Sequence, residues 1–138
     1  MSRGDVRKNI EDIYKLSPMQ QGMLLHTVVA PEDGAYFDQF VIPLAGPIDA
    51  EKLRSAWQQV VDRHGVLRTS FLWQDLDEPV QIVHRKVEVP FRVVDWSHLP
   101  DDDQRQGLAE FCEEDRRRGF DLSRAPLLRV TLIRLGDA

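Results

Sequence analysis

The sequence predicts an α+β fold, an α/β sandwich in which a mixed sheet is flanked by helices. Three observations lead to this prediction. Helical and strand-like patterns alternate along the 138 residues. Two helical patterns begin at a capping residue. A dense apolar run at residues 127–135 is typical of a buried strand. With 42% hydrophobic and 30% charged residues, the composition is that of a globular chain.

The first helix is predicted at residues 18–28. Ser17 is a good N-cap, and Pro18 takes the first helical position. Gln20 lies three residues after the cap, so the pair forms a capping box. Pro31 and Gly34 end the helix.

The middle of the chain predicts a strand, a helix and a second strand. Residues 36–44 are rich in aromatic residues and alternate in part, which indicates a strand. Asp49 caps the helix, Gly65 is expected at its C′ position, and a strand is predicted at 66–73. One face of this helix carries its apolar residues at helical spacing: Leu53, Ala56, Trp57, Val60, Val61 and His64.

The second half predicts strands on either side of a third helix. Residues 80–83 and 87–94 are expected to be strands, with Pro90 marking an edge or a bulge. Acidic residues 101–103 begin the helix, where the helix dipole favours negative charge, and Gly119 ends it. Its inner face is expected to contain Leu108, Phe111, Cys112 and Asp115.

Composition excludes several classes of protein. The formal net charge of −5 argues against a nucleic-acid partner, and the basic run 116–118 is interpreted as the solvated end of a helix. The single cysteine, Cys112, is interpreted as a packing residue and requires no oxidising compartment. No apolar run is long enough to cross a membrane, and residues 1–8 are not a signal peptide, so the expected location is the cytoplasm.

Motifs that carry chemistry are largely absent. The sequence has no phosphate-binding glycine loop and no Gly-x-Ser-x-Gly elbow. No metal site is predicted, because no two of the four histidines share a ligand spacing: His26, His64, His84 and His98. His64 is the most tempting general base, but no partner for it can be identified, and its position favours the role of a helix C-terminal histidine.

Two stretches nevertheless form a recognisable pattern. They are Ser-Pro-Met-Gln-Gln-Gly-Met-Leu-Leu-His at 17–26 and Arg-His-Gly-Val-Leu-Arg-Thr-Ser-Phe at 63–71. Together they resemble the first two core motifs of nonribosomal peptide synthetase condensation domains, and the second matches RHxxLRTxF at every fixed position. Shorter pieces at 35–37, 77–81 and 119–129 extend the resemblance over nearly the whole chain.

The resemblance implies a fold similar to chloramphenicol acetyltransferase. Members of the family join an upstream acyl or peptidyl group to a downstream aminoacyl group through an amide. Both substrates arrive as thioesters on the phosphopantetheine of carrier proteins, so no directly bound cofactor is expected. Residues 10–138 would form the N-terminal lobe, incomplete and ending before the catalytic motif, and residues 1–9 a tail or linker.

That catalytic motif, HHxxxDG, does not occur in the sequence, so no catalytic residue is predicted here. The resemblance implies that Arg63 and Arg68 support the catalytic loop, one of them by pairing with the Asp of that motif. Without that Asp, the buried arginine is expected to lack a partner. Five further positions match the motifs in tunnel or structural roles: Ser17, Gln20, Gln21, His26 and His64.

Three functional interpretations remain open. The leading one is part of a condensation domain that is inactive alone. The second is a non-catalytic module that docks a carrier protein or the missing half. The third is a free-standing acyltransferase of the wider superfamily. The first motif is also similar to variants that accept a D-residue. In an incomplete lobe the last strand would lack neighbours in its sheet, so its exposed edge predicts non-native dimers of the isolated chain.

Overall fold

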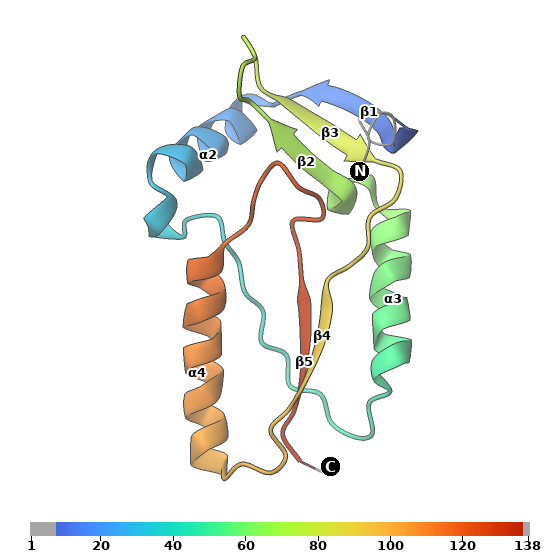
Figure 1. Ribbon diagram of the computed structural model, residues 1–138, viewed down its shortest axis with the longest axis vertical. Helices are drawn as coiled ribbons and strands as arrows, with labels where there is room; N and C mark the ends of the chain where they lie inside the picture. Colours follow the sequence, from blue (N-terminus) through green and yellow to red (C-terminus); the bar gives the residue numbers. More distant parts are fainter. Residues whose placement is uncertain (1–7, 137–138) are drawn as a thin grey trace.

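The computed structural model describes residues 8–136 (Figure 1). Within them, an antiparallel sheet in the order β1-β3-β2 is formed by Ile10–Lys15 (β1), Val80–His84 (β3) and Thr69–Leu72 (β2). A second, parallel pair is formed by Phe91–Asp95 (β4) and Val130–Arg134 (β5). The helical elements are Pro18–Val29 (α2), Ala50–Arg63 (α3), Asp101–Arg118 (α4) and the short 3₁₀ turns Pro31–Asp33 (η1) and Gly65–Arg68 (η2).

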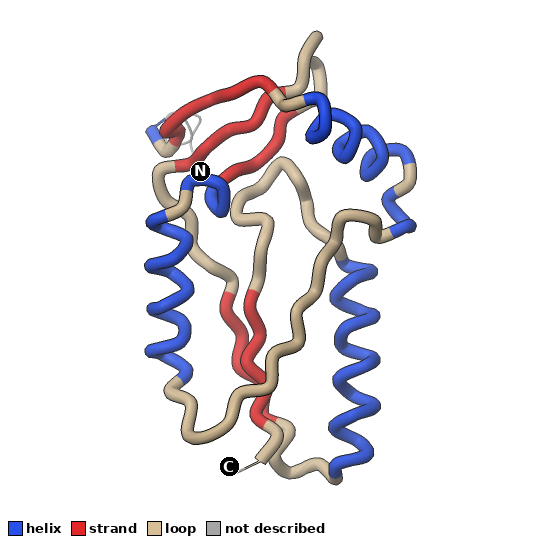
Figure 2. The backbone as a smooth tube through the Cα atoms, turned by 180° about the vertical axis from the view of Figure 1, so that it is seen from behind, coloured by secondary structure: helices blue, strands red, loops and turns tan. Residues whose placement is uncertain are grey.

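The elements form two connected parts. In Figure 1, the β1-β3-β2 sheet and α2 lie at one end, while β4 and β5 run lengthwise between α3 and α4. Figure 2 shows the same arrangement from behind, with one long helix on each side of the strand pair. The prediction of mixed sheets flanked by helices is confirmed.

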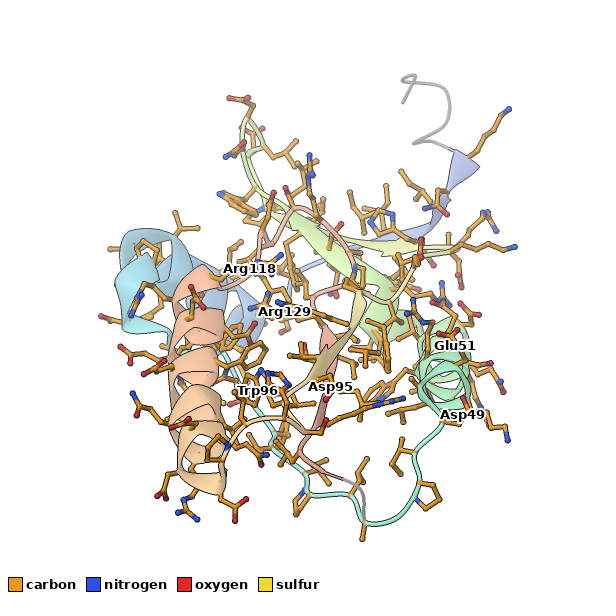
Figure 3. The ribbon with its side chains drawn as sticks, turned by 60° about the horizontal axis from the view of Figure 1, so that its bottom comes forward. Asp49, Glu51, Asp95, Trp96, Arg118 and Arg129 are labelled. Carbon is orange, nitrogen blue, oxygen red and sulfur yellow. The ribbon has the colours of Figure 1, made fainter. Side chains whose placement is uncertain are left out.

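Helix starts follow the predicted capping signals. The Ser17 hydroxyl accepts from the Gln20 backbone N–H at 3.2 Å, and the Gln20 side chain accepts from the Ser17 N–H at 2.9 Å. Asp49 accepts from the backbone N–H groups of Glu51 and Lys52, and Figure 3 shows Asp49 and Glu51 at the start of α3. These interactions satisfy backbone donors that a helix leaves unpaired at its first turn.

The predicted strand at 36–44 is wrong. This segment is irregular, and most of its apolar side chains are exposed to solvent: Phe40 is 84% exposed and Ile42 69%. Gln39 ties the segment to α4 by donating to the Cys112 carbonyl at 2.9 Å. A strand needs a neighbour that completes its ladder, and no described strand pairs with this segment.

Strand boundaries differ from the predictions in several places. The strand β1 lies in a segment that the sequence pattern does not identify as a strand. The predicted strand at 66–73 divides into η2 and β2, and the one at 87–94 becomes regular only where β4 begins. The last strand, β5, is shorter than the apolar run that contains it and is half-buried rather than buried. It pairs with a described strand on one side only.

Packing faces are narrower than the sequence pattern suggests. On α3, Val61 is fully buried and Leu53 and Trp57 are half-buried, but Ala56, Val60 and His64 are exposed, contrary to the prediction. Gly65 follows the C-cap but does not adopt a left-handed backbone conformation. A glycine is therefore favoured here by the little space beside it. A Cβ there would sit 3.4 Å from Val83. The predicted inner face of α4 is confirmed as half-buried, with Gln104 added to it.

The predicted tail, residues 1–9, lies mostly outside the described residues. Asn9, its last residue, is held by residues 85–86, because its side chain donates to the Lys86 carbonyl and accepts from the Lys86 N–H. The boundary therefore stays a prediction. Among the described residues, no helix combines the length and the apolar character that a membrane crossing requires.

Candidate functional site

Arg68 is the buried centre of the second motif, with 6% of its surface exposed. Its Nε donates to the Val61 carbonyl at 3.1 Å, which ties it to the end of α3. Its Nη1 donates to the carboxylate of Glu11 at 2.7 Å and to the carbonyl of His84. The expectation that a buried arginine would lack a partner is wrong, since Glu11 of β1 supplies the counter-charge.

Arg63 and His64 lie apart from this cluster. Both are exposed at the end of α3. His64 is the C-cap, and its backbone N–H donates to the Val60 carbonyl at 3.1 Å. The structure thus separates the two motif arginines, and of the two only Arg68 is buried. The supporting role assigned to this pair remains a prediction.

The first motif is attached to the sheet through amide side chains. Gln20 Nε2 donates to Gln81 Oε1 at 3.2 Å, and Gln81 Nε2 donates back to Gln20 Oε1 at 3.1 Å. Gln21 donates to the Leu16 carbonyl at 3.2 Å, across the start of α2. Both glutamines therefore have structural partners, and the partner of Gln20 lies on β3.

His26 lies at the other end of α2. Its Nε2 is 3.3 Å from the Asp33 carboxylate, and its ring meets the ring of Tyr36 edge-on at 5.7 Å. These contacts hold the turn after α2 against the helix. The structure therefore does not bring His26 together with Arg68 or His64.

Two cavities lie side by side on one face of the β1-β3-β2 sheet. One has a volume of about 100 Å³ and the other about 330 Å³. Val66, Thr69 and Gln81 border both, so the two cavities are adjacent, and together they are called the groove. Gln20 borders the smaller cavity and Glu11 the larger one. Residues of the first and second motifs therefore meet around one groove.

Sequence reasoning missed a partly buried polar pair in the same sheet. Ser70, which is 2% exposed, lies with its hydroxyl 2.8 Å from His84 Nε2. Burial lowers the pKa of His84, and the positive charge of Arg68 lowers it further. The only signal in the sequence was strand alternation at 80–84, which did not identify a partner for the histidine.

Metal ligands are not gathered in the part of the chain that the structure describes. There, no group of three or more His, Cys, Asp or Glu side chains is arranged to hold an ion.

Comparison with known proteins decides the family. A family model described as "Condensation domain" matches residues 10–138. The chain belongs to the condensation-domain family. Among curated relatives, it is 48% identical to a linear gramicidin synthase polypeptide of Brevibacillus parabrevis over 126 residues, 91% of this chain. It is 39% identical to bacitracin synthase 1 of Bacillus licheniformis over 128 residues, 93% of this chain. The family is thus that of the condensation domains of nonribosomal peptide synthetases.

Solved structures agree on the fold of this condensation-domain chain. The starter condensation domain of rhizomide synthetase RzmA superposes with a TM-score of 0.73 at 22% identity, over 91% of this chain and 31% of that one. A four-domain nonribosomal peptide synthetase bound to AMP and glycine superposes with a TM-score of 0.71 at 21% identity, over 92% and 9% of the two chains. The chain spans about 2% of the length of the two curated synthases.

Proposed function

We propose that residues 10–138 form the first lobe of a condensation domain that makes an amide bond. The donor is an acyl or peptidyl thioester on an upstream carrier protein, and the acceptor is an aminoacyl group on a downstream carrier. The observation that carries the proposal is the groove where the two family motifs meet, with Gln20 from the first and Val66 and Thr69 from the second. The family match over the same residues supports it.

The proposed division of labour follows from the motifs present. HHxxxDG does not occur in the sequence, so the reacting histidine is expected from polypeptide outside residues 10–138. Arg68 would then support the loop that carries it. The substrates bring their own phosphopantetheine, and the chain holds no cofactor of its own. Its partners are carrier proteins and the remainder of the synthetase, in the cytoplasm.

A chimera tests this proposal. Residues 10–138 would replace the matching segment of the linear gramicidin synthase polypeptide that is 48% identical to this chain, and amide formation between carrier-bound substrates would be followed by mass spectrometry. We expect the chimera to form product, while the isolated chain forms none. An Arg68→Ala chimera is the companion variant, expected to lose product formation.

Two outcomes would contradict the proposal. One is a folded chimera that loads both carriers yet forms no amide. The other is amide formation by the isolated 138-residue chain, which would require a catalytic group that the motifs do not supply.

A second candidate is a docking module without catalysis. It is favoured by apolar side chains left in solvent between η1 and α3, of which Phe40 is 84% and Ile42 69% exposed. The partner would be a carrier protein or the rest of the domain, and in isolation the free edge of β5 would pair with a second copy. Titration with a loaded carrier would show saturable binding in the isolated chain. Light scattering that reports a monomer at high concentration would exclude the self-pairing.

A further inference from the structure

The strand β1 contains a bulge at Glu11. In the antiparallel pairing with β3, Ile10 lies opposite His84 and Asp12 lies opposite Val83, so two steps along β1 match a single step along β3. Glu11 is the extra residue between them. A bulge of this kind turns a side chain away from the regular alternation of a strand, and bulges are frequent beside functional sites.

The bulged residue contacts one group in particular. Glu11 Oε2 accepts from Arg68 Nη1 at 2.7 Å, although the two residues are 57 positions apart in the chain. The side chain of Arg68 is 7% exposed and that of Glu11 46%, so a buried cation is paired with a carboxylate that reaches it from the solvent side. Hydrogen bonds between ionised partners are about twice as strong as neutral ones.

Two of the three guanidinium nitrogens of Arg68 have hydrogen-bond acceptors among the described residues, and the third does not. Nε and Nη1 donate to Val61, Glu11, His84 and Arg85. Nη2 donates to none of the described residues. It lies near Gly65, where a Cβ would come within 3.9 Å of it. Gly65 and Glu11 both border the larger cavity, so Nη2 lies beside a glycine that lines the same cavity as Glu11.

We propose that Glu11 is a positioning residue, placed beside Arg68 by the β1 bulge. Its carboxylate fixes the orientation of the guanidinium. In that orientation Nη2 can donate to a carbonyl or carboxylate acceptor. The planar fork of an arginine offers five N–H donors, and anchoring one edge determines where the other edge points. The functional meaning rests on the proposed condensation function. The orientation of Arg68 is a property of this chain alone.

The test is nitrogen-15 NMR of the arginine side chains in the 138-residue chain. A guanidinium whose rotation is hindered gives separate Nη1 and Nη2 resonances, and we expect such a pair for Arg68 in the unsubstituted protein. In Glu11→Ala we expect the rotation to be about tenfold faster, which corresponds to about 1.4 kcal/mol. Glu11→Asp should behave like Glu11→Ala, because the shorter side chain keeps the charge but not the reach.

The matched control is Asp12→Asn. Asp12 is the next residue of β1, and its carboxylate bonds to Tyr14 rather than to Arg68. This variant should leave the Arg68 resonances unchanged. Averaged Nη resonances in the unsubstituted protein would overturn the proposal whether or not any variant folds. Slow rotation retained in folded Glu11→Asp would overturn it too, since charge alone would then suffice. A fall in stability with unchanged Arg68 resonances would mark Glu11 as merely structural. None of these outcomes depends on amide formation.

Discussion

The side-chain amides of Gln20 and Gln81 face each other and exchange two hydrogen bonds, of 3.2 and 3.1 Å. Gln20 is also the N3 residue of the capping box of α2, so the same side chain closes the helix start and joins it to β3. This pair holds the first family motif against the sheet that carries the end of the second.

Breaking this pair is expected to destabilise the fold. Gln81→Ala leaves the amide of Gln20 without its partner, which costs about 1–2 kcal/mol. Urea unfolding of Gln20→Ala, Gln81→Ala and the double variant should give a coupling energy of about 1 kcal/mol between the two positions. Gln59→Ala, which removes an exposed glutamine of α3, serves as control. Strictly additive effects would show that the two amides do not interact in solution.

The ion pair between Arg129 and Asp115 should matter far more than those on the surface. Arg129 Nε donates to Asp115 at 2.6 Å, the two side chains are 14% and 19% exposed, and the guanidinium lies 4.3 Å from the centre of the Phe120 ring. Figure 3 shows Arg129 near the end of α4 that carries Arg118. Asp115→Ala is expected to destabilise the chain by about 3 kcal/mol, because a largely buried cation loses its partner.

The control for this prediction is the Arg117–Glu113 pair on the same helix. Its side chains are 72% and 74% exposed. Exposed pairs contribute at most about 1 kcal/mol, so Glu113→Ala should leave the urea midpoint almost unchanged. Equal losses in the two variants would contradict the role of burial.

Local signals in the sequence predicted the helix starts. Contacts between residues far apart in the chain could not be predicted from the sequence alone. The capping box at Ser17 and the cap at Asp49 depend on residues two or three positions apart. The partner of Arg68, in contrast, lies 57 positions away on a strand that carried no clear pattern. The groove likewise depends on Gln20 meeting Gln81, which the chain order does not reveal.

The error at residues 36–44 has the same origin. Aromatic and β-branched side chains favour a strand, but that preference becomes a strand only where a neighbour completes the hydrogen-bond ladder. The described residues offer none. The family resemblance was predictable because its motifs are contiguous, whereas the positions of Arg63 and His64 on an exposed helix end required the fold.

Stability is expected to fall as the pH drops below the pKa of an ordinary histidine. Burial, and then the charge of Arg68, lowers the pKa of His84 in the folded chain. The unfolded chain therefore binds the proton more readily, with a pKa of about 6.5. The stabilisation is present above that value and is lost as the pH falls through it towards the lower folded-state pKa. Urea unfolding in steps between about pH 7.5 and pH 5.5 would measure the slope.

His84→Gln should flatten this slope, because it removes the group that titrates differently in the two states. His64→Gln is the control, since His64 is exposed at the end of α3. A slope that survives in folded His84→Gln would assign the pH dependence to another group.

Two glycines should respond to alanine in opposite directions. Gly119 ends α4 with φ 56° and ψ −151°, a conformation that side chains with a Cβ rarely adopt. Gly119→Ala is therefore expected to destabilise the chain by about 1–3 kcal/mol. Gly22 lies within α2, and a Cβ there would meet nothing within 4 Å. Gly22→Ala should stabilise the chain by about 0.5–1 kcal/mol, because alanine favours the helix over glycine. Thermal unfolding of both variants measures the two midpoints. Opposite shifts are expected if backbone conformation decides the outcome. A general effect of adding a methyl group would instead shift both midpoints in the same direction.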